Sequence, residues 1–273
     1  MLELRGISKT FHQRGQPPLH AVQDVSLNVQ PGETLALVGE SGSGKTTLAR
    51  IALRLVEPDS GDVWLDGRSL RRATRGELRA ARLRLQPVFQ DSSSAFNPRR
   101  TVRAILRQVL TQAGATSIDD AALCALLERV ELRPAAGFLD RYPNELSGGQ
   151  RQRLAVARAI APVPQVIIAD EPLSGADVSI RAQLLNLLLD LQAASGVAYL
   201  LITHDILLAQ AFADRIAVMQ HGRIVEQGDS RTVFTRPAHS YTRILIEAVQ
   251  SIDAASSGTR LIDRGADHGS QAC

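Results

Sequence analysis

Lysine, cysteine and long apolar runs are all scarce in this chain. Of its 31 basic residues only Lys9 and Lys45 are lysines, and the others are arginines. The cysteines are Cys124, within an apolar helical pattern, and Cys273, so neither a disulfide framework nor metal-ligand spacing is present. No apolar stretch approaches the roughly 20 residues of a membrane-spanning helix, and residues 1–10 lack the apolar core of an export signal. These absences predict a cytoplasmic protein that does not cross a membrane by itself.

The remaining composition is that of an ordinary globular protein with one large domain. The chain has 273 residues, a net charge of +3 and 44% hydrophobic residues. One segment, 68–107, is rich in arginine, which suits either nucleic acid or anionic lipid, or else a solvated helix face. The segment holds 11 arginines, at positions 68, 71, 72, 75, 79, 82, 84, 99, 100, 103 and 107. Because aromatic residues that stack on bases are nearly absent there, we favour the solvated face and expect no nucleic-acid partner.

The apolar pattern alternates between strands and helices along most of the chain. Strands are predicted at residues 2–5, 25–29, 35–38, 62–65, 166–169 and 198–203, and a hairpin at 216–218 and 223–225. Helices are predicted at 45–55, 119–130 and 180–194. From about 92 to 161 the strand signal disappears, which indicates a helical subdomain inserted into an α/β core. Residues 1–250 form the predicted domain, and residues 251–273 are predicted to be a disordered tail.

A phosphate-binding loop follows the predicted strand at 35–38 and precedes the predicted helix at 45–55. The segment fits G-x-x-x-x-G-K-[ST] in the required strand-to-helix context. Its residues are Gly39, Glu40, Ser41, Gly42, Ser43, Gly44, Lys45 and Thr46, and Thr47 continues the predicted nucleotide contacts. Backbone N–H groups and the helix N-terminus hold the polyphosphate, with the Lys45 ammonium at the β and γ phosphates. The Thr46 hydroxyl is a predicted Mg²⁺ ligand, so the sequence predicts an ATP site.

Two carboxylates stand at the end of the predicted strand at 166–169. Asp170 is expected to reach the Mg²⁺ sphere, while Glu171 is expected to point toward an attacking water as the catalytic base. The phosphate-binding loop and this acidic pair together predict nucleotide hydrolysis.

A second phosphate nest lies about 100 residues beyond the first. It is formed by Ser147, Gly148, Gly149 and Gln150, at the start of an amphipathic helix within the helical insertion. On these motifs residues 1 to about 250 resemble the ATP-binding cassette of ABC transporters. The resemblance implies a P-loop NTPase fold with a mostly parallel core sheet, an N-terminal antiparallel β-subdomain and an inserted helical subdomain. It also implies that this signature segment closes over ATP held by a second ATPase subunit.

The resemblance assigns roles to four further residues. Phe11 matches the aromatic that stacks on adenine, and Gln90 matches a glutamine that contacts Mg²⁺ and the lytic water. His204, after the strand at 198–203, is similar to the histidine that contacts the γ-phosphate. Asp177 matches the D-loop aspartate, although residues 174–177 read Ser-Gly-Ala-Asp where the family usually has Ser-Ala-Leu-Asp. That departure removes a leucine side chain from the expected subunit interface.

Two segments resemble the peptide and nickel importer branch of the family. Residues 97–99 read Asn-Pro-Arg, and residues 237–242 read Pro-Ala-His-Ser-Tyr-Thr, as in that branch's Pro-x-His-x-Tyr-Thr element. Ser92 departs from the proline often found there. The resemblance implies a homo- or heteromeric ATPase pair, two membrane permease subunits and, indirectly, a solute-binding protein, with the chain bound peripherally at the cytoplasmic face of the inner membrane.

Two alternatives use the same cassette. One is the ATPase of an exporter or lipoprotein-release system, against which the two branch-specific segments argue. The other is an ABC ATPase acting on nucleic acid, which requires a long coiled-coil, zinc or second-cassette insertion. Residues 45–147 have room only for the helical subdomain.

Overall fold

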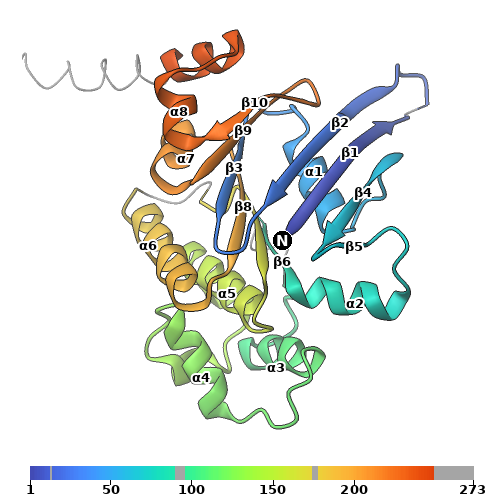
Figure 1. Cartoon of the computed structure of the whole chain (residues 1–273). Helices are drawn as coiled ribbons and strands as arrows, with labels where there is room; N and C mark the ends of the chain where they lie inside the picture. The colour runs from blue at the N-terminus through green and yellow to red at the C-terminus, as the bar shows by residue number, and fades with distance from the viewer. Residues whose placement is uncertain (13, 90–95, 174–177, 249–273) are drawn as a thin grey trace, which may run out of the picture.

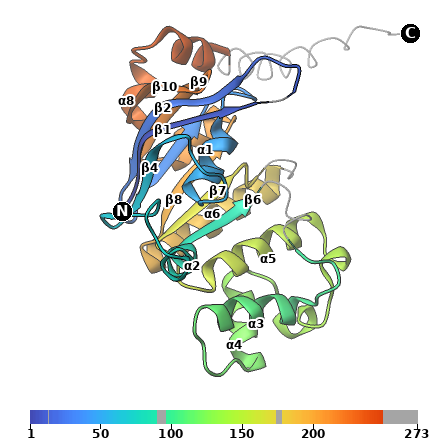
Figure 2. The same ribbon diagram turned by 90° about the vertical axis from the view of Figure 1, so that its right-hand side faces the viewer.

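Two β-sheets and a group of helices at one end make up the protein. The computed structural model describes residues 1–12, 14–89, 96–173 and 178–248, so the predicted tail at 251–273 lies outside the described residues. The helices α3 and α4 lie at the end of the molecule opposite α8 (Figures 1 and 2). Within the described residues no helix has the length and apolar character needed to cross a bilayer.

The core sheet has the strand order β10-β9-β3-β8-β7-β6. Its strands are β3 (Thr34–Val38), β6 (Leu85–Phe89), β7 (Val166–Asp170), β8 (Ala198–Thr203), β9 (Arg215–Gln220) and β10 (Arg223–Asp229). All neighbours are parallel except β9 and β10, which form the predicted hairpin. The carboxyl ends of β3, β7 and β8 therefore share one edge of the sheet.

Alternation along β7 and β8 divides the apolar core between the two faces of this sheet. Ile167 and Tyr199 belong to the core that packs with the helices α5 (Gly148–Ile160) and α6 (Val178–Ser195). Ile168 and Leu200 belong to the core on the other face, with the helix α1 (Lys45–Ala52). Both faces are covered, which explains why these strands are continuous apolar runs.

The second sheet is antiparallel and covers α1. Its order is β2-β1-β4-β5, with β1 (Leu2–Phe11), β2 (Leu19–Val29), β4 (Ser60–Leu65) and β5 (Arg68–Ser69). Leu2, Leu4 and Ile7 of β1 are essentially inaccessible to solvent and share one core with Leu48 and Ile51 of α1. Burial between the two sheets accounts for the apolar positions of α1, which are Leu48, Ala49, Ile51 and Ala52. The two-sheet architecture confirms the predicted ABC cassette fold.

Helices replace strands between the described residues 96 and 161, as predicted. This region contains α3 (Val102–Gln112), α4 (Asp120–Arg129), the short 3-10 helices η1 (Ala135–Phe138) and η2 (Pro143–Glu145), and α5. Side chains at the N-cap positions fix the starts of the three longer helices, because Thr101, Asp119 and Ser147 each accept a hydrogen bond from a backbone N–H of the first turn. Leu106, Leu127 and Leu154 join these helices in one buried cluster.

The helix α2 (Arg75–Arg84) and the strand β6 are absent from the sequence prediction. Of the residues in α2 only Ala81 is buried, so the helix has no apolar stripe; a capping box between Thr74 and Glu77 starts it. The strand β6 contains Pro87, which argues against a strand in the middle of a sheet. Within the described residues β6 is an edge strand that pairs with β7 alone, and an edge position can accommodate proline.

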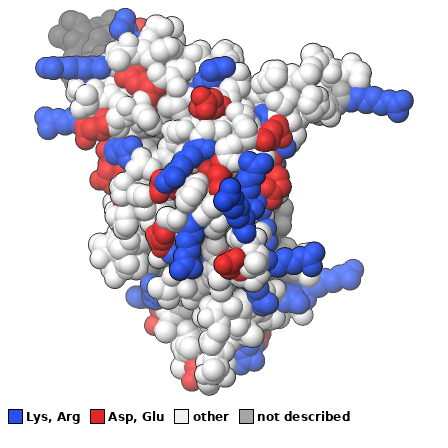
Figure 3. Space-filling view, turned by 45° about the vertical axis from the view of Figure 1, so that its right-hand side comes forward, with Lys and Arg blue, Asp and Glu red and all other residues white. Residues whose placement is uncertain are grey.

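The arginine-rich segment lies on a face that carries both signs of charge. Figure 3 shows acidic side chains among the basic ones on this face. Arg84 pairs with Asp66, and Arg103 pairs with Asp120 and Asp140. These ion pairs place Arg84 and Arg103 in a solvated surface of mixed charge.

The C-terminal part returns to the core sheet. It contains α7 (Ile206–Phe212), α8 (Ser230–Thr235) and a helix over residues 240–248. Val38 of β3, Val218 of β9 and Tyr241 of this last helix share a third buried cluster. The C-terminal helix therefore packs against the strand that leads into the phosphate-binding loop.

Candidate nucleotide site

The phosphate-binding loop connects β3 to α1, and its lysine side chain is buried. Lys45 is 5% exposed, and its Nζ donates hydrogen bonds to the carbonyl oxygens of Gly39 and Glu40, each at 2.7 Å. Burial lowers the pKa of the Lys45 ammonium, although nearby carboxylates oppose the shift. The loop thus holds a compact cation at the N-terminus of a helix, where a phosphate group finds both charge and N–H donors.

The turn between β9 and β10 is hydrogen-bonded to this loop. The Gly222 backbone N–H donates to the Ser43 carbonyl oxygen at 2.9 Å, and the Gln23 N–H donates to the Gly222 carbonyl oxygen at 2.7 Å. The sequence pattern indicated the hairpin at His221 and Gly222 but gave no signal that its turn contacts the loop. This contact joins segments almost 180 residues apart, so only the tertiary packing creates it.

Thr46 and Asp170 bring two oxygen donors together. The Thr46 hydroxyl donates to Asp170 Oδ1 at 3.3 Å. Asp170 is 6% exposed, and burial raises the pKa of its carboxyl group. No cluster of three or more His, Cys, Asp or Glu side chains suited to a metal ion is present among the described residues. Hydroxyl and carboxylate oxygens, completed by phosphate and water, are what Mg²⁺ prefers, so the pair fits that ion.

Glu171 and His204 meet at the ends of neighbouring strands. Glu171 Oε1 lies 3.0 Å from His204 Nδ1, and the Glu171 backbone N–H donates to the Ile202 carbonyl oxygen at 2.8 Å. Glu171 has a positive φ of 48°, which turns the chain away from β7 directly after Asp170. The two acidic side chains therefore leave the strand in different directions: Asp170 meets Thr46, and Glu171 meets His204.

A cleft of about 390 Å³ opens beside the loop. Its walls include Phe11 from β1, Lys45, Thr46 and Thr47 from α1, and Glu171. Phe11 is 37% exposed and lies 5.6 Å from the Lys9 ammonium. The structure thus brings the predicted aromatic and the phosphate-binding residues to one cavity. His20, Gln23 and His221 also line it, and none of these was predicted.

The signature segment lies in another part of the molecule. Ser147 and Gln150 form a capping box at the start of α5, with the Gln150 N–H donating to Ser147 Oγ at 3.2 Å. Ser147, Gly148, Gly149 and Gln150 are not among the residues that line the cleft, and α1 and α5 lie at different levels of the molecule (Figure 2). This separation agrees with a second phosphate nest that serves another subunit. Gln90 and Asp177 lie outside the described residues.

Comparison with protein families gives two matches. A family model described as "ABC transporter" matches residues 22–174, more than half of the chain. A second, described as "Oligopeptide/dipeptide transporter, C-terminal region", matches residues 225–270. The second match includes the Pro-x-His-x-Tyr-Thr element, and it confirms the resemblance to the peptide branch.

Curated relatives and solved structures agree with these families. The glutathione import ATP-binding protein GsiA of Salmonella choleraesuis (strain SC-B67) is 44% identical over 270 residues, 96% of this chain and 43% of that protein. GsiA of Escherichia coli (strain K12) is 49% identical over 233 residues, 85% of this chain and 37% of that protein. The chain thus spans about two fifths of the length of these relatives. The dimeric post-hydrolysis structure of the ATP-binding cassette MJ0796, bound to ADP and Pi, has a TM-score of 0.73 and 31% identity, and covers 85% of this chain and 99% of that chain.

Proposed function

The chain belongs to the ABC transporter ATP-binding family, and on that premise we propose that it is the ATP-hydrolysing subunit of a peptide-type importer at the cytoplasmic face of the membrane. One observation carries the proposal. The start of α1 and the ends of β7 and β8 bring five side chains together at one edge of the parallel sheet: Lys45, Thr46, Asp170, Glu171 and His204. Ligands bind at this edge in open α/β sheets.

The phosphate-binding loop positions ATP for hydrolysis. Residues 39–47 hold the phosphates, with Lys45 at the β and γ groups and Phe11 against the adenine. Thr46 and Asp170 would hold Mg²⁺ through their side-chain oxygens, and the resemblance adds Gln90. An ion held there would supply positive charge to the terminal phosphates. Asp170 is positioned for this role by its hydrogen bond with Thr46.

Glu171 acts as the general base. Its carboxylate accepts a proton from the attacking water, whose oxygen forms a bond to the γ-phosphorus as the bond to the β–γ bridging oxygen breaks, giving ADP and phosphate. His204 Nδ1 lies 3.0 Å from one carboxylate oxygen of Glu171, so the histidine positions the base, and the resemblance adds a contact between His204 and the γ-phosphate. A general base of this kind contributes about 10²–10⁴-fold to the rate.

A second ATPase subunit completes the site. The signature segment lies away from this chain's own cleft. We therefore assign it to the γ-phosphate bound by the partner subunit; its residues are Ser147, Gly148, Gly149 and Gln150. Asp177 acts at the same interface by resemblance. Closure of two such sites transmits ATP binding to the membrane partners.

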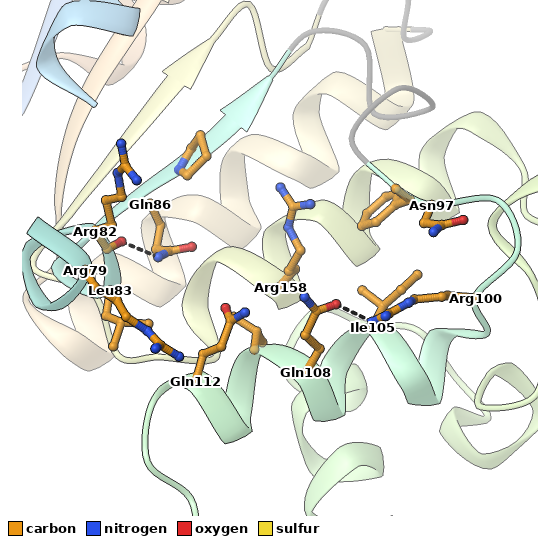
Figure 4. A pocket seen from close by; sticks show the side chains of 13 residues that line it. Arg79, Arg82, Leu83, Gln86, Asn97, Arg100, Ile105, Gln108, Gln112 and Arg158 are labelled. Carbon is orange, nitrogen blue, oxygen red and sulfur yellow. Dashed lines mark hydrogen bonds between the residues drawn. The ribbon is translucent and has the colours of Figure 1, made fainter. Parts of the chain in front are cut away.

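A groove on the described surface fits a permease segment. It has a volume of about 600 Å³ and lies between α2 and β6 on one side and α3 and α5 on the other (Figure 4). Among the described residues, its lining includes the arginines Arg79, Arg82, Arg100 and Arg158 and no acidic residue. An acidic cytoplasmic segment of the permease is the complementary partner.

The groove is connected to the nucleotide site through β6. Gln86 and Pro87 line the groove, and the same strand pairs in register with β7, so that Phe89 lies opposite Asp170. A permease segment in the groove would therefore contact β6, which is hydrogen-bonded to β7, the strand that carries the proposed Mg²⁺ ligand Asp170. Arg79→Glu should weaken co-purification with the permease pair, while the matched control Arg75→Glu, on α2 but outside the groove, should not.

Glu171→Gln tests the hydrolytic assignment. The amide cannot accept the water's proton but keeps the size of the side chain, so the variant should bind ATP normally and lose at least about 100-fold in turnover. Glu128→Gln, on the exposed surface of α4, is the matched control. Turnover at the wild-type rate in Glu171→Gln would exclude Glu171 as the base.

The transported solute is proposed to be a peptide. The C-terminal family match and the glutathione importers among the relatives support this class. Reconstitution with the permease pair and its binding protein tests it: di- and oligopeptides or glutathione should stimulate ATP hydrolysis. Stimulation by Ni²⁺ alone would assign the chain to nickel transport, and failure of every binding protein to stimulate would favour an exporter.

A further inference from the structure

The C-terminal helix reaches back to the phosphate-binding loop through one tyrosine. Tyr241 is 6% exposed and packs with Val38 and Val218. Its hydroxyl oxygen accepts a hydrogen bond from the Glu40 backbone N–H at 3.1 Å. The two residues are 201 positions apart, so the contact exists only because the C-terminal helix folds over the end of β3.

This hydrogen bond acts on the peptide unit that also holds the lysine. The N–H of Glu40 and the carbonyl of Gly39 belong to the same planar peptide group. Tyr241 accepts from the N–H, and Lys45 Nζ donates to the carbonyl oxygen at 2.7 Å. One rigid group therefore links the tyrosine hydroxyl on one side to the Lys45 ammonium on the other.

The peptide needs such an anchor because it follows a glycine. Gly39 has a φ of 151°, and a Cβ at this position would lie 2.2 Å from the Met219 carbonyl oxygen. Only glycine fits, and glycine also leaves the peptide free to rotate. Rotation would direct the carbonyl oxygen away from Lys45 and leave the N–H without its acceptor.

Neighbouring contacts fix the position of the tyrosine. The carboxylate of Glu226, on β10, accepts hydrogen bonds from the backbone N–H groups of Ala238 at 2.8 Å and His239 at 3.0 Å. His239 Nδ1 in turn accepts from the Tyr241 backbone N–H at 3.2 Å. The start of the helix over residues 240–248 is thus tied to the core sheet.

The same helix also borders the hydrolytic residues. A cavity of about 440 Å³ on this side of the loop is lined by Leu245 together with Glu40, Glu171 and His204. The C-terminal segment therefore forms part of the surroundings of the nucleotide site.

We propose that Tyr241 is a positioning residue for ATP binding, which holds the Gly39–Glu40 peptide so that Lys45 is oriented before the nucleotide arrives. The C-terminal segment is then a functional part of the nucleotide site. This role depends on the ATPase activity of the family and not on the identity of the transported solute.

Tyr241→Phe tests the role, because it removes one hydroxyl and keeps the ring in its apolar cluster. The dissociation constant for trinitrophenyl-ATP with Mg²⁺ should rise about fivefold, the effect of losing one typical hydrogen bond. The turnover number at saturating ATP should change less than twofold, since Tyr241 does not touch the reacting atoms. The increase should thus appear in KM.

Tyr199→Phe is the matched control. The Tyr199 hydroxyl is also buried and donates to the Leu188 carbonyl oxygen at 2.9 Å, on the opposite face of the sheet from α1. The Tyr199→Phe variant should lower the melting temperature about as much as Tyr241→Phe does, without changing nucleotide affinity. Equal affinity of Tyr241→Phe and wild type, or equal weakening by the two variants, would overturn the proposal.

A second variant covers the case in which Tyr241→Phe folds poorly. Glu226→Gln leaves the tyrosine intact but removes one of the two carboxylate acceptors that hold the preceding turn. It should also raise the dissociation constant for the ATP analogue, with little change in turnover at saturation. Unchanged affinity in a folded Glu226→Gln protein would contradict the anchoring role.

Discussion

Gly39→Ala is expected to damage both the fold and the nucleotide site. Gly39 connects the end of β3 to the phosphate-binding loop, next to the backbone of β9. An added Cβ would lie 2.2 Å from the Met219 carbonyl oxygen and 3.2 Å from the Met219 carbonyl carbon. These are backbone atoms of a strand hydrogen-bonded in the core sheet, so no flexible side chain can move aside to relieve the overlap.

The expected loss of stability follows from two contributions. A non-glycine residue held in a sparsely populated backbone region costs about 1–3 kcal/mol. Overpacking against well-packed neighbours costs about another 1–3 kcal/mol. The total of about 2–6 kcal/mol corresponds to a fall of roughly 4–24 °C in melting temperature for a domain of this size. If the loop shifts instead, the strain appears as lost ATP affinity, because the Gly39 carbonyl holds Lys45.

The assay combines thermal melting without nucleotide and titration with a fluorescent ATP analogue. Gly114→Ala is the matched control: Gly114, beyond the end of α3, also has a positive φ of 93° but has no atom within 4 Å of a built Cβ. It should lose only the backbone contribution and bind ATP normally. If Gly39→Ala has the melting temperature and the ATP affinity of the wild type, the inferred overlap between a Cβ at position 39 and the Met219 carbonyl oxygen is refuted.

The remaining predictions concern Asp170 and the signature segment. Burial raises the pKa of Asp170 above its unfolded value of 3.8, so its contribution to stability is largest below that value and falls as pH rises through the folded pKa. Asp170→Asn should therefore melt higher than the wild type at neutral pH without nucleotide, although it removes the proposed Mg²⁺ ligand. A difference in melting temperature that does not shrink in acid would refute this reasoning. Ser147→Ala and the control Thr101→Ala each remove an N-cap, which costs about 1 kcal/mol, or roughly 2–4 °C in melting temperature. Only Ser147→Ala should also reduce ATP hydrolysis, so equal hydrolysis rates would contradict the signature role.

Local patterns were enough to predict most of the core sheet and its helices. The strands β7 and β8 are continuous apolar runs because both of their faces are covered. The helix α2 and the strand β6 were missed for opposite reasons. The first has no apolar stripe and depends on the capping box at Thr74, and the second contains Pro87, which only an edge position allows.

The sequence by itself predicted the chemistry of the nucleotide site. The spacing from Gly39 to Thr46 predicts phosphate binding locally, because consecutive residues on a strand-to-helix turn reach one ligand, and the pair Asp170–Glu171 at a strand end predicts a metal ligand and a base. Only the tertiary structure decided what surrounds this site. The turn at Gly222 and the hydroxyl of Tyr241 support the loop from distant parts of the chain. Such contacts depend on strand order and helix packing, which no local spacing specifies.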